Sequence, residues 1–70
     1  MLNKYTVTRN GEIVRDRGSY IILAVSATAA IEQAIYLYAD KIASNDAYRQ
    51  MYQYYCELAE DATYSAKQII

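Results

Sequence analysis

Residues 4–15 read KYTVTRNGEIVR, and this stretch decides how the first part of the chain folds. The runs on either side of Asn10-Gly11 alternate in polarity and are rich in β-branched and aromatic residues. Asn-Gly between two such runs is the strongest short-range signal for a hairpin with a two-residue turn. That turn would place Arg9 opposite Glu12, so that unlike charges meet at the tip. We therefore expect a β-hairpin.

A third strand is expected directly after the hairpin. Residues 16–19 (DRGS) have the composition of a turn, and residues 20–25 (YIILAV) form a continuous apolar run. We predict a three-stranded antiparallel meander, in which a one-residue slip of the third strand would exchange its two faces. Without a slip, the core face holds Tyr5, Val7, Val14, Ile21, Leu23 and Val25. The open face then shows an apolar patch of Ile13, Tyr20 and Ile22, which favours contact with a second copy of the chain or with another partner.

Two amphipathic helices are expected in the second half. Ser26 is a suitable cap for a helix that begins at Ala27 and has apolar residues at helical spacing. The cap-rich residues 44–46 separate it from a second helical pattern over residues 47–69. A break at Glu60-Asp61 stays open, because Asp61 could cap a separate terminal helix. The predicted fold is a single α+β domain over residues 1–70, with both helices on one face of the sheet.

The composition favours binding over catalysis. The chain of 70 residues has nine tyrosines and no histidine, and Cys56 is its only cysteine. Acid–base catalysis, metal ligation and activated nucleophiles usually need histidine or several cysteines. Tyrosine instead supplies a large contact area at a low cost in side-chain entropy. We expect no catalytic residue, no metal and no cofactor.

The charge and the apolar runs indicate a cytoplasmic protein without a membrane segment. The net charge is −1, and the longest uncharged run, residues 18–31, is too short to span a bilayer. Charged residues interrupt the N-terminus before any apolar stretch, unlike a signal peptide. A chain this short has a small core, so formation of a homodimer is a further source of stability that the sequence leaves open.

The first candidate site is an acidic and tyrosine-rich helical face. On one long helix, Glu57 and Asp61 would form a like-charge pair four residues apart, which is mildly unfavourable. Such local violations of stabilising rules tend to occur where function requires them. Carboxylates would steer the protein toward a basic partner and tyrosines would supply contact area. The alternative is an ordinary solvated helix face. The predicted partner-binding residues are Tyr36, Tyr54, Glu57, Glu60, Asp61 and Tyr64.

The second candidate site is the basic hairpin. Basic residues interleaved with tyrosines on a sheet can follow a phosphate backbone and stack on bases. Glu12 and Asp16 offset part of this charge, and charged residues also protect strand edges from unwanted pairing. We therefore keep nucleic-acid binding as the alternative function. Its predicted residues are Lys4, Arg9, Arg15 and Arg17.

Residues 5–14 (YTVTRNGEIV) and 19–34 (SYIILAVSATAAIEQA) carry a resemblance to known proteins. The plan resembles small phage and mobile-element proteins in which a hairpin and a further strand lead into an A-x-S-x-x-x-A helix. Compact anti-CRISPR proteins and other anti-defence inhibitors are similar to it. The resemblance implies a protein that binds a large host complex, such as a CRISPR effector or another defence subunit. It would block the nucleic-acid site or a conformational step of that complex.

Overall fold

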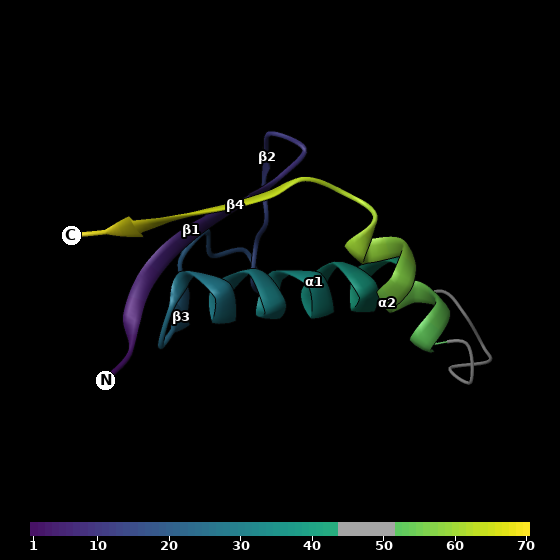
Figure 1. Cartoon of the computed structure of the whole chain (residues 1–70), viewed down its shortest axis with the longest axis horizontal. Helices are drawn as coiled ribbons and strands as arrows, with labels where there is room; N and C mark the ends of the chain where they lie inside the picture. Colours follow the sequence, from purple (N-terminus) through teal and green to yellow (C-terminus); the bar gives the residue numbers. More distant parts are fainter. Residues whose placement is uncertain (44–51) are drawn as a thin grey trace.

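The computed structural model describes residues 1–43 and 52–70, and it has two layers. A small antiparallel sheet lies on one side, α1 packs beneath it, and α2 lies against one end of α1 (Figure 1). This arrangement confirms the α+β class. In chain order the elements are β1 (Asn3–Arg9), β2 (Glu12–Ile13), β3 (Ile22–Ala24), α1 (Ala27–Ala43), α2 (Tyr52–Glu60) and β4 (Tyr64–Ile69).

The predicted hairpin is confirmed. Arg9 pairs with Glu12 across a two-residue turn, and the ladder continues from Thr8 to Ile13. Asn10 and Gly11 have positive φ angles of 50° and 84°, as the central residues of a type I′ turn require. The hairpin therefore forms from local chemistry in the register that the sequence predicts.

The predicted meander is wrong, because β3 pairs with β1 and not with β2. Residues 16–19 do form a tight turn, but it supports only one isolated bridge, between Asp16 and Ser19. The chain then crosses to the N-terminal half of β1, where Tyr5 pairs with Ile22. β2 has only two residues and therefore few backbone groups that could pair with a third strand. β2 pairs only with Thr8 and Arg9, so the N-terminal half of β1 keeps backbone groups on that edge for pairing with β3. Because β4 pairs with β1 from Lys4 to Arg9 along its other edge, β2 and β3 share one edge of β1.

The third strand also presents the face opposite to the expected one. Ile22 and Ala24 are each only 1% exposed, whereas Leu23 and Val25 lie at the surface. This is the one-residue slip that the sequence left open. It removes Ile22 from the predicted apolar patch, of which Ile13 and Tyr20 stay exposed.

The largest correction concerns the end of the chain. The predicted helix over residues 47–69 ends at Glu60, and the last six of its residues form β4. β4 pairs with the free edge of β1 from Lys4–Ile69 to Arg9–Tyr64. The predicted cap-rich residues 44–46 and the predicted helical residues 47–51 lie outside the described residues.

Asn10 helps to place β4. The backbone N–H of Asn10 donates to the carbonyl of Thr63 (2.8 Å), and its side-chain oxygen accepts from the N–H of Thr63 (3.0 Å). The hairpin turn therefore holds the residue immediately before β4. This long-range contact satisfies backbone groups that a terminal helix would have satisfied locally.

The core lies between the sheet and the N-terminal half of α1. Ser26 caps this helix, since its Oγ accepts from the N–H of Ala29 (3.1 Å), as predicted. Ala30 and Ala34 are fully buried beneath the sheet, and Ile22 and Val7 are the largest fully buried side chains. The core cluster consists of Tyr5, Val7, Val14, Ile22, Ala24, Ala30 and Ala34.

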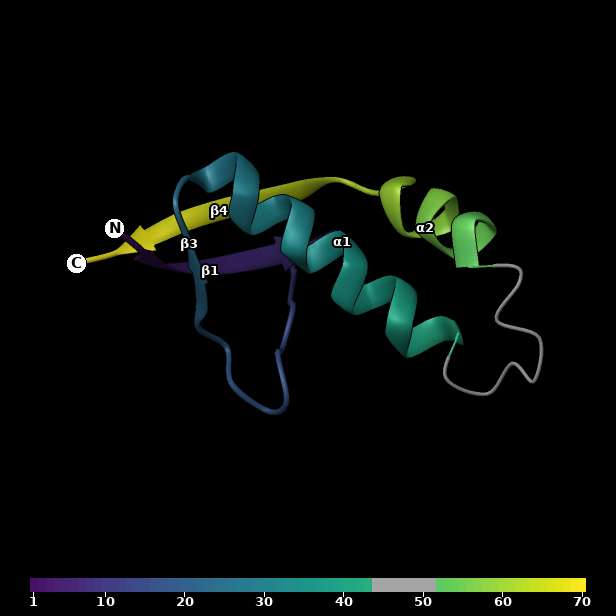
Figure 2. The ribbon, with the colours of Figure 1, turned by 90° about the horizontal axis from the view of Figure 1, so that it is seen from below.

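The C-terminal half of α1 packs against α2. The two helices contact each other, and Figure 2 shows α2 beside α1 on the side of β4. Ala39, Ala43 and Ala59 are buried but do not belong to the core cluster under the sheet. We assign their burial to the contact between the helices, where small side chains allow a close approach.

Candidate interaction surfaces

The exposed side of α2 carries tyrosine, leucine and acidic side chains together. Ala59 is fully buried, so the opposite side of this helix faces solvent. Tyr54 is 49% exposed and Leu58 is 42% exposed, four residues apart on adjacent turns. The Tyr54 ring rests edge-on against Tyr55, with ring centroids 5.6 Å apart, which restricts its motion. We call Tyr54, Glu57, Leu58 and Glu60 the α2 outer face.

The carboxylates of the α2 outer face lie at the C-terminal end of the helix, where negative charge is unfavourable. A helix C-terminus carries a partial negative charge and is stabilised by Lys or Arg. The last turn of α2 has no basic residue and instead contains Glu57 and Glu60. Asp61 follows immediately, is exposed, and lies outside the helix. The expected like-charge pair therefore does not sit on one helix, but the acidic residues do gather at one helix end.

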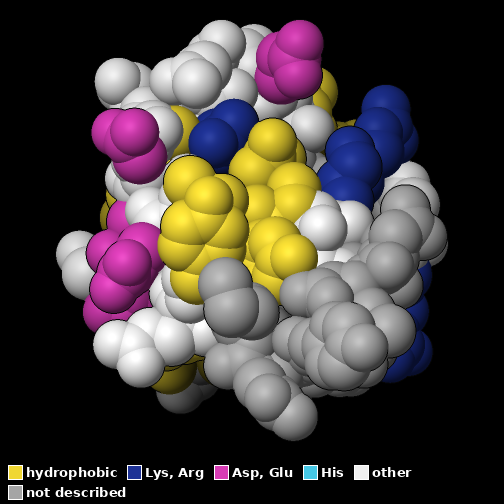
Figure 3. Space-filling model, turned by 90° about the vertical axis from the view of Figure 1, so that its right-hand side faces the viewer, with side chains coloured by type: hydrophobic (Ala, Val, Ile, Leu, Met, Phe, Trp, Pro, Cys, Tyr) yellow, Lys and Arg dark blue, Asp and Glu magenta, His cyan; other side chains and the backbone are white. Residues whose placement is uncertain are grey.

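Tyr36 borders the same region from α1. It is 56% exposed and precedes Ala39 and Ala43 by three and seven residues, so it lies on the side of α1 that we assign to α2. Figure 3 views this end of the molecule. Apolar side chains gather there, with acidic side chains along one side and mainly basic ones along the other. The structure thus gathers most of the predicted partner-binding residues at one end.

Tyr64 does not join this surface. It lies on β4, is half-buried, and its hydroxyl donates to the carbonyl of Ala59. The same hydroxyl accepts from Arg9 Nε (3.2 Å), and the Arg9 guanidinium carbon lies 3.8 Å from the centroid of the Tyr38 ring. These contacts join β1, α1, α2 and β4, and we call Arg9, Tyr38 and Tyr64 the arginine junction. Sequence reasoning missed it because its members are far apart in the chain.

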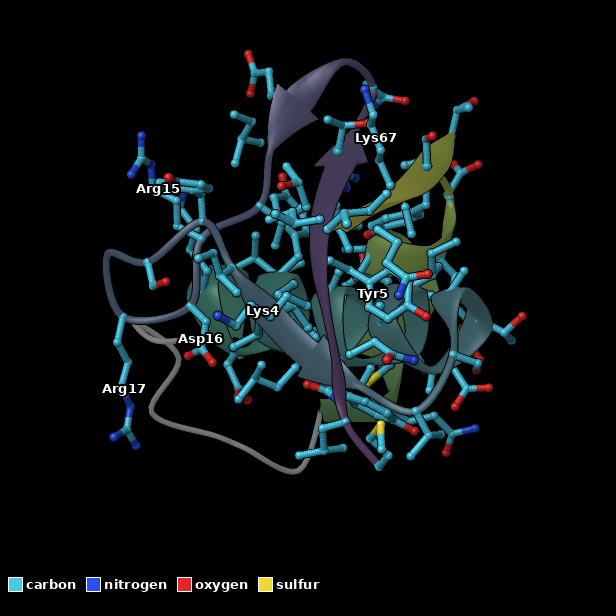
Figure 4. The ribbon with its side chains drawn as sticks, turned by 90° about the vertical axis from the view of Figure 1, so that its left-hand side faces the viewer. Lys4, Tyr5, Arg15, Asp16, Arg17 and Lys67 are labelled. Atoms are coloured by element: carbon cyan, nitrogen blue, oxygen red, sulfur yellow. The ribbon has the colours of Figure 1, made fainter. Side chains whose placement is uncertain are left out.

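The four cations predicted for nucleic-acid binding do not form one array. Arg9 belongs to the arginine junction, and Lys4 lies on the sheet face away from α1, opposite in direction to Tyr5. Arg15 donates from Nη1 to the carbonyl of Gly18 (3.2 Å). Figure 4 shows the side chains of Arg15 and Arg17 extending outward from the segment after β2.

A groove lies between the segment that follows β2 and the C-terminal half of α1. Its volume is about 810 Å³, and its apolar surface comes from Ile13, Val14, Leu37 and Tyr38. Figure 2 shows the segment after β2 on the opposite side of α1 from α2. The charged lining residues are Arg9, Glu12, Arg15, Asp16, Arg17, Asp40 and Lys41.

The described residues contain neither a candidate metal site nor a helix that could cross a membrane. Within residues 1–43 and 52–70, no group of three or more His, Cys, Asp or Glu side chains is placed to hold a metal ion. In the same part of the chain, neither helix is long and apolar enough to cross a membrane. Comparisons with protein family models, with curated proteins and with solved structures gave no match to this chain.

Proposed function

We propose that the protein is a non-catalytic binding module that docks onto a basic surface of another protein. The docking surface is the α2 outer face together with Tyr36 and Asp61. By its resemblance to compact anti-defence proteins, we further propose that the partner is a host nucleic-acid-targeting complex, which docking inhibits. Tyr64 contributes indirectly, because it helps to hold α2 and β4 in place.

The observation that carries this proposal is the charge at the end of α2. Glu57, Glu60 and Asp61 stand where the helix dipole disfavours negative charge, and the last turn has no basic residue to offset them. Exposed Tyr54 and Leu58 lie beside them. A basic partner would relieve the repulsion, and the tyrosine and leucine would supply the apolar contact typical of interface hot spots.

The basic hairpin is the weaker candidate for the main function. A surface that follows a nucleic-acid backbone needs several cations free to meet successive phosphates. The Arg9 side chain is instead engaged by Tyr38 and Tyr64. Glu12 and Asp16 also lie among the remaining arginines.

Capture of partners from a bacterial lysate tests the proposal. Tagged protein is washed at moderate salt, treated with nuclease, and its partners are quantified by mass spectrometry. We expect a stoichiometric protein partner that survives nuclease. Tyr54→Ala should reduce capture about tenfold or more, because truncation of an aromatic hot-spot residue costs about 2 kcal/mol or more and about 1.4 kcal/mol corresponds to tenfold.

Tyr20→Ala is the matched control for this variant. Tyr20 is 52% exposed, close to the 49% of Tyr54, but it lies in the segment between β2 and β3. Its replacement should leave capture unchanged. Equal capture by both variants would contradict the assignment to α2, and loss of every partner on nuclease treatment would favour nucleic-acid binding.

A further inference from the structure

The strand β4 has one edge that no other described strand covers. Within the described residues it pairs only with β1, from Lys4–Ile69 to Arg9–Tyr64. Figure 2 shows no strand on the other side of β4. Its six residues form the longer continuous edge of the sheet, because the opposite edge is divided between β2 and β3.

The register with β1 decides which backbone groups of β4 point outward. In an antiparallel pair, residues that exchange hydrogen bonds alternate with residues that do not. The carbonyl of Thr63 accepts from the N–H of Asn10, so the bonds to β1 fall at the odd-numbered residues of β4. The N–H and C=O groups of the even-numbered residues, Tyr64, Ala66 and Gln68, therefore point away from β1. No contact among the described residues bonds these backbone groups.

This edge has little of the usual protection against pairing. Free strand edges are commonly blocked by proline, by bulges or by several charged side chains. β4 has the sequence YSAKQI, which contains no proline and a single charged residue, Lys67. Its pairing with β1 also runs without a bulge. The edge therefore remains a suitable template for a further strand.

The side of β4 that faces α1 is only partly covered. Tyr5 and Val7 on β1 are buried in the core cluster. Their cross-strand partners on the same face are Gln68, which is exposed, and Ala66, which is half-buried. Ala66 packs against the core cluster without being enclosed by it. The core layer thus ends at β4, and a further strand there would extend it.

We propose that the free edge of β4 pairs with β4 of a second copy of the chain, antiparallel about a two-fold axis at Ala66. In this register Ala66 lies opposite Ala66 of the second copy, and Tyr64 lies opposite Gln68 of the second copy. All of these residues have outward-pointing backbone groups, so each pair exchanges both of its N–H···O bonds. The contact uses the same surface in both copies and therefore closes as a dimer.

The charge of β4 favours this register over its neighbours. Lys67 lies opposite Ser65 of the second copy, so the two lysines do not face each other directly. A shift of two residues in one direction would place Lys67 opposite Lys67 of the second copy, and like charges directly opposite are unfavourable. A shift in the other direction would place Gln68 opposite Ala62, which precedes the strand. The register at Ala66 therefore combines the longest ladder with no direct lysine pair.

A second copy also suits the side of the edge that faces α1. Alanine meets alanine at the axis, where small side chains allow the two core layers to join. A domain of 70 residues has a small core and gains stability from such association. The antiparallel arrangement places the two α2 helices at opposite ends of the joined strands. The α2 outer face takes no part in the contact, so dimer formation and partner binding can fail independently.

Hydrogen exchange on the unmodified protein tests the proposal. Amide exchange is followed by NMR from micromolar to millimolar concentration, and analytical ultracentrifugation gives the mass at the same concentrations. We expect a monomer–dimer equilibrium in which the amides of Tyr64, Ala66 and Gln68 become protected as the dimer forms. The amides of Ser65 and Lys67 bond to β1 and should be protected throughout. A monomer at every concentration, or fast exchange of Ala66 in the dimer, would overturn the proposal.

A proline variant tests the position of the axis. Ala66→Pro removes the central outward-pointing N–H and leaves the ladder to β1 in place. It should weaken dimer formation about tenfold or more, because both central donors are lost and their acceptors stay unpaired. Leu23→Pro is the matched control, since the N–H of Leu23 points outward on the opposite edge of the sheet. It should leave the dimer intact. A dimer that survives Ala66→Pro, or that both variants weaken equally, would overturn the proposal.

Charge variants test the register and decide the matter if the proline variant does not fold. Ser65→Glu should strengthen the dimer at least about twofold, because each copy then places a carboxylate opposite Lys67 of the other. Ser65→Lys should weaken it by a similar factor. Leu23→Glu and Leu23→Lys make the same charge changes on the opposite edge and should leave the dimer unchanged. Effects of the same sign from both Ser65 variants would overturn the proposed pairing.

Discussion

The two halves of α1 pack against very different neighbours. The N-terminal half lies beneath the sheet, where Ala30 and Ala34 meet a cluster that contains Tyr5, Val7 and Ile22. The C-terminal half lies against α2, and its fully buried residues are alanines. The buried residues of α1 are alanines in both halves, but only those at the sheet end belong to a cluster with large buried side chains such as Tyr5, Val7 and Ile22.

This difference indicates that the two ends of the molecule have different roles. Buried apolar area and close packing stabilise the sheet end, which holds the hairpin and both long strands in register. At the helix end, Tyr54 and Leu58 remain at the surface, where a partner protein can bury them. We infer that the sheet end determines the fold and that the helix end carries the partner surface.

The largest effect is expected from truncation in the sheet end. Ile22→Ala should lower the free energy of unfolding by about 2 to 5 kcal/mol, because it removes a fully buried branched side chain. Leu58→Ala at the helix end should change it by less than about 0.5 kcal/mol. Urea denaturation followed by circular dichroism measures both, and similar losses would erase the distinction between the two ends.

Overpacking of the helix contact should have the next largest effect. Ala59 is fully buried, and Ala59→Leu should destabilise the protein by about 1 to 3 kcal/mol by forcing α2 away from α1. Ala27→Leu adds the same atoms at an exposed position of α1 and serves as the control. Thermal unfolding compares the two variants. No loss of stability in Ala59→Leu would mean that the helices do not pack through alanines.

A smaller effect is expected from the arginine junction, which links the two ends. Tyr64→Phe removes the hydroxyl that bonds both Arg9 and the carbonyl of Ala59, and should cost about 1.5 kcal/mol. Tyr36→Phe alters an exposed tyrosine and should be nearly neutral. Chemical denaturation gives both values. A neutral Tyr64→Phe variant would show that the junction does not stabilise the fold.

The smallest expected effect is a gain in stability. Glu60→Lys replaces an acidic residue with a basic one in the last turn of α2, and should stabilise the protein by about 0.3 to 1 kcal/mol at low salt. The gain should shrink as salt is added, because exposed charges are screened. A melting series over salt concentration measures it. A loss of stability would show that Glu60 has a structural role.

The elements set by neighbouring residues could be predicted from the sequence. The hairpin follows from Asn10-Gly11, and the start of α1 follows from the Ser26 cap. The strand β4 could not be predicted in this way. Ala62, Ala66 and Ile69 are spaced as on a helix, and only pairing with the distant β1 makes the segment a strand.

The candidate surfaces were predictable to a similar extent. Exposure of Tyr36, Tyr54 and Glu57 follows from helical spacing, and the structure places them at the surface. The roles of Arg9 and Tyr64 depend on contacts between residues 55 positions apart, which periodicity does not reveal. The register of β3 likewise depends on burial of Ile22 against the rest of the core.

The most direct test combines binding and stability in one double variant, Glu57→Lys with Glu60→Lys. Partner capture from lysate and the unfolding midpoint are measured on the same preparations, with Glu12→Lys on the hairpin as the charge-reversal control. The account predicts a loss of capture of about tenfold or more in the double variant, with an unfolding midpoint that stays the same or rises. The control should capture the partner normally. Full capture by a folded double variant would contradict the claim that the helix end carries the partner surface.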